Sequence, residues 1–196
     1  MARFSKALNL YSKTAKDLGI NNTPGVDTNV DPTLTYEFIM GNLESLHKNC
    51  VGPIMDHFNS IPGSSGNSIG ISCGYRCMEL NRAIKPPGSR NSQHIYGYAI
   101  DLIYIEGHAS EIFNWSINNL PSWSQIIWEF PEKGRWSPSN QNCEWIHISY
   151  QEGKNKRTKS VATIREDIHK AYTNDVNTNR KGSYTHGITD ADQTLV

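Results

Sequence analysis

One long segment of the chain carries hydrophobic residues on a helical repeat. Its apolar side chains recur at spacings of three and four, which places them on one face of an α-helix. The residues of this face are Tyr36, Ile39, Leu43, Leu46 and Cys50. We expect the helix to continue, bent near Pro53, to Phe58 and to be the main helix of the core. A shorter helix is expected over residues 4–19, ended by Gly19.

Short runs of strand-forming residues, bounded by turn residues, follow this helix. The expected strands cover residues 69–75, 98–104, 124–130 and 144–150. Helical composition occurs at residues 76–84 and 109–119, and turn-rich loops occur at residues 61–68, 85–91 and 131–142. Strands flanked by segregated helices are typical of an α+β domain. We therefore expect an α+β fold with a small antiparallel sheet flanked by helices.

Two of the expected strands carry a polar side chain among apolar ones. Because side chains alternate across a strand, Asp101 shares a face with Ala99, whose small side chain leaves space beside the carboxylate. His147 lies similarly on the strand 144–150, and His94 precedes Asp101 by seven residues. A buried carboxylate needs a partner, and Zn²⁺ pairs well with one carboxylate and two neutral imidazoles. These residues are candidate zinc ligands, although their spacing alone favours three side chains that are each satisfied separately.

Composition and charge narrow the classes of partner. The chain has 19 basic and 19 acidic residues, so no field of the whole protein favours nucleic acid or an anionic membrane. No apolar run approaches the roughly 20 residues of a membrane span, and the N-terminal stretch lacks the apolar core of a signal peptide. Reduced thiols are then the expected state of the four cysteines.

Three motifs surround the candidate ligands. The pattern Ser-x-His-x-x-Gly-x-Ala-x-Asp is present as Ser92, His94, Gly97, Ala99 and Asp101. Downstream, Glu-x-x-His is present as Glu144 and His147. Upstream, a Gly-Tyr-Arg stretch with an Asn five residues later is present as Gly74, Tyr75, Arg76 and Asn81. Together these motifs resemble the D-alanyl-D-alanine carboxypeptidase family of zinc peptidoglycan peptidases, which includes phage endolysins and the D-Ala-D-Ala dipeptidases of vancomycin resistance. The resemblance covers roughly residues 4–150.

The resemblance implies a role for each matched residue. His94, Asp101 and His147 would bind one zinc ion. Glu144 would be the general base, and Arg76 would stabilise the substrate carbonyl as it becomes an oxyanion. Ser92 and Tyr75 would contact the substrate, and the fold would be that of the hedgehog and D-Ala-D-Ala peptidase group. The implied substrate is the stem peptide of peptidoglycan, cut by a carboxypeptidase or an endopeptidase that a phage encodes for cell-wall lysis or penetration.

Two departures from the family pattern concern the substrate cleft. Cys73 stands where the family has Ser, which brings a thiol towards the expected site, and residues 85–91 replace the usual Gly-Gly loop. Among the histidines outside the motifs, His108 follows the Asp101 strand most closely. Two alternative functions stay open, a catalytically silent zinc-binding module with the same fold and a virion-associated structural protein. The expected location is the host cytoplasm before lysis, or the phage virion.

The last 46 residues differ from the rest in composition. We expect residues 1–150 to form the zinc peptidase domain and residues 151–196 a polar, partly helical extension. In one interpretation the extension attaches to the cell wall or to a phage structural protein through its basic residues, Lys154, Lys156, Arg157 and Lys159. In the other it packs on the domain as a helix with an apolar face formed by Val161, Ile164, Ile168 and Tyr172.

Overall fold

The computed structural model of the chain describes residues 10–84, 87–153, 160–164 and 185–186. The first described helix, α2 (Lys13–Leu18), is capped at both ends by local contacts. The hydroxyl of Ser12 accepts a hydrogen bond from the backbone N–H of Ala15, and Gly19 ends the helix with a φ of 68°. A positive φ suits glycine because it has no Cβ. The expected end of the first helix is thereby confirmed. The expected helix over residues 4–19 is wrong at Tyr11 and Ser12, which are not helical, because Ser12 is extended and caps a helix that begins at Lys13.

The main helical segment runs from Tyr36 to Asn59 in three parts. It consists of α3 (Tyr36–Leu46), a π-helical turn η1 (His47–Val51) and α4 (Gly52–Asn59). Thr35 caps α3 by accepting a hydrogen bond from the N–H of Phe38. The extra residue of the π-helical turn lies just before Pro53, whose missing N–H fits the first turn of α4. The expected helix is confirmed, and the π-helical turn interrupts its α-helical geometry just before Pro53.

The described strands form one sheet in the order β1-β2-β4-β3-β5-β6. The four strands β1 (Ile69–Cys73), β2 (Ala99–Tyr104), β4 (Trp145–Ser149) and β3 (Gln125–Glu129) pair antiparallel. The strand β5 (Ser160–Ile164) then pairs with β3 in parallel, and β6 (Thr185–His186) pairs antiparallel with β5. The α+β class and the antiparallel centre of the sheet are as expected from the sequence.

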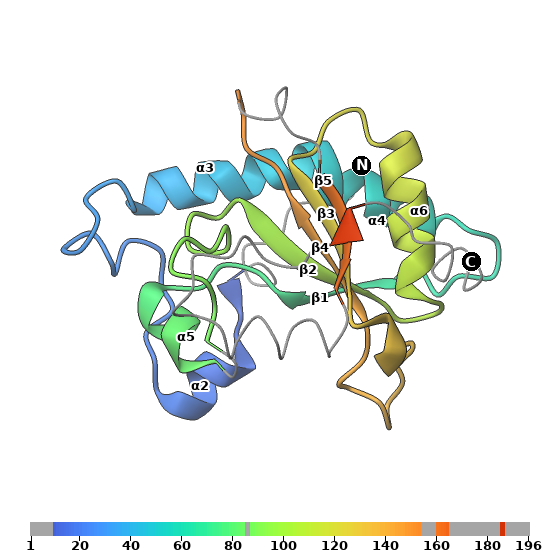
Figure 1. Ribbon diagram of the computed structural model, residues 1–196, viewed down its shortest axis with the longest axis horizontal. Helices are drawn as coiled ribbons and strands as arrows, with labels where there is room; N and C mark the ends of the chain where they lie inside the picture. Colours follow the sequence, from blue (N-terminus) through green and yellow to red (C-terminus); the bar gives the residue numbers. More distant parts are fainter. Residues whose placement is uncertain (1–9, 85–86, 154–159, 165–184, 187–196) are drawn as a thin grey trace.

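The helices cover one face of the sheet and leave the other for the site. Buried residues of α3, α4 and α6 (Ala109–Asn119) share one hydrophobic core with the central strands. In Figure 1, α2 and α5 (Met78–Ala83) lie together at one end of the molecule. The residues of the central strands that face the helices are fully buried, namely Ile100, Leu102, Ile126, Ile146 and Ile148. Burying such a side chain contributes about 1.5–3 kcal/mol, so this face is the core that fixes the sheet in place.

The segment after residue 150 corrects one prediction. The helix expected from Val161 to Tyr172 is wrong at residues 160–164, which form β5 beside β3. This part of the expected extension contributes a strand to the sheet, while the division of the chain at residue 150 stays a prediction. The basic residues 154–159 and the segment 165–172 lie outside the described residues.

Two further observations concern the expected environment of the protein. Within the described residues, no helix combines the length and apolarity needed to cross a bilayer. All four cysteines are free, and Cys50, Cys77 and Cys143 are buried. Burial raises the pKa of the Cys50 thiol to about 12, which keeps it protonated and unreactive at neutral pH.

Candidate metal centre

Strand pairing places three chemically reactive residues in one row across the open face of the sheet. Asp101 on β2 is directly opposite His147 on β4, and on its other side it is opposite Cys73 on β1. Directly opposed residues of an antiparallel pair point to the same face. A β-bulge between Ile71 and Cys73 inserts Ser72, so that Cys73 and not Ser72 faces Asp101. The alternation expected from the sequence for Asp101 and His147 is therefore confirmed.

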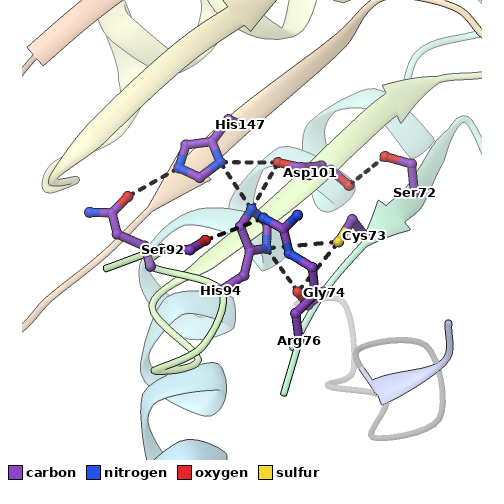
Figure 2. Close-up of polar contacts among 9 residues, drawn as sticks. Ser72, Cys73, Gly74, Arg76, Ser92, His94, Asp101 and His147 are labelled. Atoms are coloured by element: carbon purple, nitrogen blue, oxygen red, sulfur yellow. Dashed lines mark hydrogen bonds and ion pairs between the residues drawn. The ribbon is translucent and has the colours of Figure 1, made fainter. Parts of the chain in front are cut away.

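His94 reaches this row from the loop that precedes β2. The loop turns at Gly97, whose φ is 71°, and a Cβ at that position would lie 2.6 Å from the carbonyl oxygen of Ile39. Only glycine fits both the positive φ and this close approach to α3. The backbone N–H of Arg76 also donates to the carbonyl of His94, at 3.2 Å. These contacts hold the histidine over the sheet (Figure 2).

Three ligand atoms converge in the space between these side chains (Figure 2). The carboxylate oxygen Oδ1 of Asp101 lies 3.3 Å from Nε2 of His94 and 3.0 Å from Nδ1 of His147. The two ring nitrogens are 3.2 Å apart. Ligands at about 2.0–2.1 Å from a tetrahedral zinc ion are separated by about 3.3 Å. The triangle of atoms therefore has the size of one face of a zinc coordination sphere, and its members are almost fully buried.

The outer nitrogens of both histidines fix which atoms face inward. Nδ1 of His94 donates to the carbonyl of Gly74 at 2.8 Å, and Nε2 of His147 donates to the amide oxygen of Gln93 at 3.0 Å. Because each acceptor is an oxygen, the proton of each neutral ring lies on its outer nitrogen. The inner nitrogens then present lone pairs towards the Asp101 carboxylate. Three such acceptors at this distance repel one another unless a cation lies among them, so the donor set fits a zinc ion.

The protonation of the cluster agrees with this arrangement. Burial lowers the pKa of His94, which keeps the ring neutral at pH 7. Burial by itself would raise the pKa of Asp101, but His94 and His147, when they carry a proton on the inner nitrogen in place of the metal, outweigh it by charge and hydrogen bonding and hold that pKa well below its usual range. An ionised carboxylate beside a neutral imidazole is the protonation state that metal binding requires.

Cys73 lies at the border of the cluster. Its sulfur, a nitrogen of His94 and a carboxylate oxygen of Asp101 all lie within 4.8 Å of one another. The sulfur is 3.9 Å from Nδ1 of His94, the nitrogen that is already bonded to Gly74. Cys73 therefore lies against the outer edge of His94, whereas His147 shares the inner side with Asp101. Burial raises the pKa of the Cys73 thiol to about 12.

Arg76 and Ser92, two other residues singled out by the motifs, lie together beside the cluster. One terminal nitrogen of Arg76 donates to the hydroxyl of Ser92 at 3.3 Å (Figure 2). Within the described part of the chain, the buried Nε of Arg76 has no hydrogen-bond partner. The positive charge of Arg76 also helps to lower the pKa of His94. A guanidinium with an unused donor beside a metal site can bind an anionic or carbonyl group of a ligand.

Tyr75, expected to contact the substrate, lies elsewhere. Its side chain is 1% exposed and packs in the hydrophobic core. Its hydroxyl has no hydrogen-bond partner among the described residues, and burial raises its pKa. The backbone carbonyl of Tyr75 accepts a hydrogen bond from Asn22, which attaches the segment after α2 to this stretch. Tyr75 therefore packs in the core and does not reach the cluster of His94, Asp101 and His147.

Glu144, expected to be the general base, is not brought to the cluster either. It is 2% exposed, and its two carboxylate oxygens accept three hydrogen bonds. The donors are Nδ1 of His108 at 3.1 Å, the backbone N–H of Ala109 at 3.1 Å and the indole N–H of Trp128 at 2.8 Å. Glu144 thus joins β3 to the start of α6, on the face of the sheet that packs against the helices. His108, noted in the sequence, contacts this glutamate and not the metal cluster.

Two residues at the site were not singled out by the sequence. Gln93 orients His147, and Glu129 lies on β3 on the same face as His147, one row away. Burial, followed by the negative charge of Asp101, raises the pKa of Glu129 to about 7. A signal for Glu129 was present, since it is a carboxylate on an apolar strand, as Asp101 is. Gln93 has no such signal beyond its place next to His94.

A separate hollow of about 560 Å³ lies between the loops that follow α4 and β3. Its lining includes Tyr104, Glu106, Arg135 and Trp136. None of His94, Asp101 and His147 lines it. The hollow therefore belongs to the loop region beyond the end of β2 and not to the metal cluster.

Comparison with known proteins agrees with this geometry. A family model described as Peptidase M15 matches residues 32–123, a segment that contains Arg76, His94 and Asp101 and ends before His147. No curated protein and no solved structure shows a significant match to the chain. The match supports the M15 family of zinc metallopeptidases, which are hydrolases, for the segment that carries two of the three converging ligand atoms.

Proposed function

We propose that this protein is a zinc-dependent peptidase that hydrolyses peptide bonds of bacterial peptidoglycan. The observation that carries the proposal is the convergence of Nε2 of His94, Oδ1 of Asp101 and Nδ1 of His147 on one point, at mutual distances of 3.0–3.3 Å. Three protein ligands with an open fourth position are characteristic of catalytic zinc, whereas structural zinc is enclosed by four. The Peptidase M15 match supports the same class of reaction.

In this proposal some residues of the chain bind the zinc ion and others stabilise the charge that develops on the substrate. His94, Asp101 and His147 hold the zinc ion, which when bound lowers the pKa of a water molecule towards 7. Gln93 and the carbonyl of Gly74 keep the two imidazoles in the required tautomer. Ser92 holds the guanidinium of Arg76, whose positive charge would stabilise the developing negative charge of the substrate carbonyl. Stabilising that charge lowers the barrier because it is larger in the transition state than in the substrate.

The finer assignment rests on the family motifs. The resemblance to phage endolysins and D-Ala-D-Ala peptidases supports stem peptides as the substrate and a phage-encoded enzyme of cell-wall lysis or penetration. Carboxypeptidase and endopeptidase activity differ in whether the cleft accepts a chain terminus or an internal bond. The loops expected at residues 61–68, 85–91 and 131–142 are the segments that would decide this. Phage structural proteins are proposed as further partners on the same basis.

The proposal is tested by comparing Asp101→Asn with the control Asp17→Asn. Asp17 is on the exposed side of α2, where it pairs with Lys13. We expect wild type and Asp17→Asn to bind one equivalent of zinc and to release peptidoglycan fragments, whose masses identify the bond that is cut. We expect Asp101→Asn to lose both the zinc and the fragments.

A different result would favour another function. A wild-type protein that binds one zinc ion, melts cooperatively and releases no fragments from any peptidoglycan would be the silent zinc-binding module. Recovery of the chain from purified phage particles would add a virion-associated role without contradicting hydrolysis.

A further inference from the structure

We propose that Glu129, and not Glu144, is the general base of the peptidase reaction. This inference rests on the proposed function and deepens it by assigning a catalytic residue. It starts from strand register, since Glu129 on β3 is directly opposite Trp145 on β4, and Ile127 is directly opposite His147. Glu129 therefore points to the open face and is the diagonal neighbour of His147. Diagonal pairs of this kind lie about 7–8 Å apart at the backbone, within reach of a long side chain.

The charges around Glu129 link it to the cluster. Besides burial, three charged or chargeable neighbours act on the pKa of Glu129. The negative charge of Asp101 raises this pKa, whereas His147 and Arg76 lower it. The carboxyl group thus lies in the same electrostatic environment as two proposed ligands and the proposed oxyanion donor.

Aromatic side chains border the other side of Glu129, and the Lys133 ammonium lies over their rings. The cross-strand neighbour of Glu129, Trp145, packs against Phe130, with ring centroids 4.7 Å apart. Phe130 is the one described non-glycine residue with a positive φ, 56°, a conformation that costs energy and occurs disproportionately at functional sites. Phe130 directly follows Glu129 in the chain, and its ring packs against Trp145 and Ile127. Glu129 is therefore positioned between the proposed zinc ligands and the rings of Phe130 and Trp145, which limits its access to bulk water.

The proton transfers balance with Glu129 in this role. Its carboxylate accepts a proton from the attacking water as the new C–O bond forms at the substrate carbonyl. The protonated Glu129 then donates that proton to the amide nitrogen as the C–N bond breaks. The products are a carboxylic acid and an amine, and Glu129 returns to its ionised form. No other reactant is required.

Glu144 cannot replace Glu129 without breaking its own contacts. Both of its oxygens are occupied by donors from α6, the preceding His108 and Trp128. It would have to release them and cross to the opposite face of the sheet to reach His147. Glu129 already lies on the correct face.

The test compares three variants that change one carboxyl group each to the amide: Glu129→Gln, Glu144→Gln and the exposed control Glu152→Gln. Zinc content, binding of a synthetic stem peptide by calorimetry, and initial hydrolysis rates are measured for each, together with Glu129→Asp. We expect Glu129→Gln to keep one zinc and its peptide affinity while the rate falls by about 10²- to 10⁴-fold. Glu129→Asp should retain more activity than Glu129→Gln because it keeps a carboxylate. Folded Glu144→Gln and Glu152→Gln should hydrolyse within a few-fold of wild type.

Two results would overturn the inference while leaving the proposed function in place. One is a Glu129→Gln protein that hydrolyses the peptide at the wild-type rate. The other is a Glu129→Gln protein that no longer binds zinc, because Glu129 would then be a ligand. A wild-type protein without hydrolytic activity would instead refute the proposed function, and the assignment of a base would fall with it.

Discussion

Replacing Glu144 by Gln should destabilise the protein more than it affects hydrolysis. The Glu144 carboxylate accepts hydrogen bonds from His108, Ala109 and Trp128, all in a buried position. Glutamine has one acceptor oxygen, so its amide nitrogen must face a donor at one of these positions. If the oxygen stays with the α6 side, the indole N–H of Trp128 meets an N–H group and loses its partner.

The expected magnitude follows from these contacts. A buried donor left unsatisfied costs about 1–3 kcal/mol, and a hydrogen bond to a charged group is worth about 1.5–3 kcal/mol. Part of this is offset because the neutral amide costs less to bury than a carboxylate. We therefore expect a loss of about 2–4 kcal/mol in the free energy of unfolding. For a chain of this length the loss corresponds to a fall of roughly 5–12 °C in melting midpoint.

Thermal unfolding followed by circular dichroism, with zinc in excess, measures this effect. A matched control is Glu111→Gln, which also changes a glutamate at the start of α6. Glu111 accepts a hydrogen bond from the backbone N–H of His108 at an exposed position, so the change should cost less than about 1 kcal/mol. A Glu144→Gln protein with an unchanged midpoint and a rate reduced by a hundredfold or more would refute this reasoning and make Glu144 the base.

Three further perturbations test the loop, the second layer of the metal site and the sheet edge. Gln93→Leu removes the acceptor of the outer His147 proton, so zinc affinity in a chelator competition should fall about 10- to 100-fold; an unchanged affinity would mean that β4 alone orients the ring. Gly97→Ala should lower the urea midpoint by the equivalent of at least 1–2 kcal/mol, about the cost of a positive φ, and an equal midpoint would contradict the fit described at Ile39. Truncation after Tyr150 removes β5 from the edge of β3 and should lower the melting midpoint by roughly 8 °C or more, or about 2 kcal/mol; an unchanged midpoint would leave residues 151–196 as a separate attachment segment.

The features that could be predicted from the sequence are those that depend on local periodicity. The apolar face from Ile39 to Phe58 and the alternation around Asp101 and His147 are properties of single elements, and each is found in the structure. Tyr36, also assigned to that face, is exposed in the first turn of α3. The fit of His94 depended on more than periodicity, since its approach requires the turn at Gly97. The family motif grouped His94 with Asp101 and His147, whereas spacing alone did not.

The missed features depend on contacts between distant segments. Glu144 is three residues before His147, and an odd separation along an extended segment reverses the face, which the motif alone did not reveal. Glu129 becomes relevant only through the register of β3 on β4. Residues 160–164 have apolar positions compatible with a helix, but parallel pairing with β3 makes them a strand. Local propensity is readily overridden by such pairing.

The position of β4 has a consequence for how the protein is synthesised. β4 lies between β2 and β3, although it follows both in the chain. A nascent chain that has not yet reached residue 145 therefore has the pair β1–β2 and a β3 with neither of its partner strands. β4 also carries His147, so the last proposed ligand arrives with the strand that joins β3 to this pair. Metal capture and closure of the sheet should accordingly occur in a single late step of folding, and local detachment of β4 should release the metal and split the sheet together.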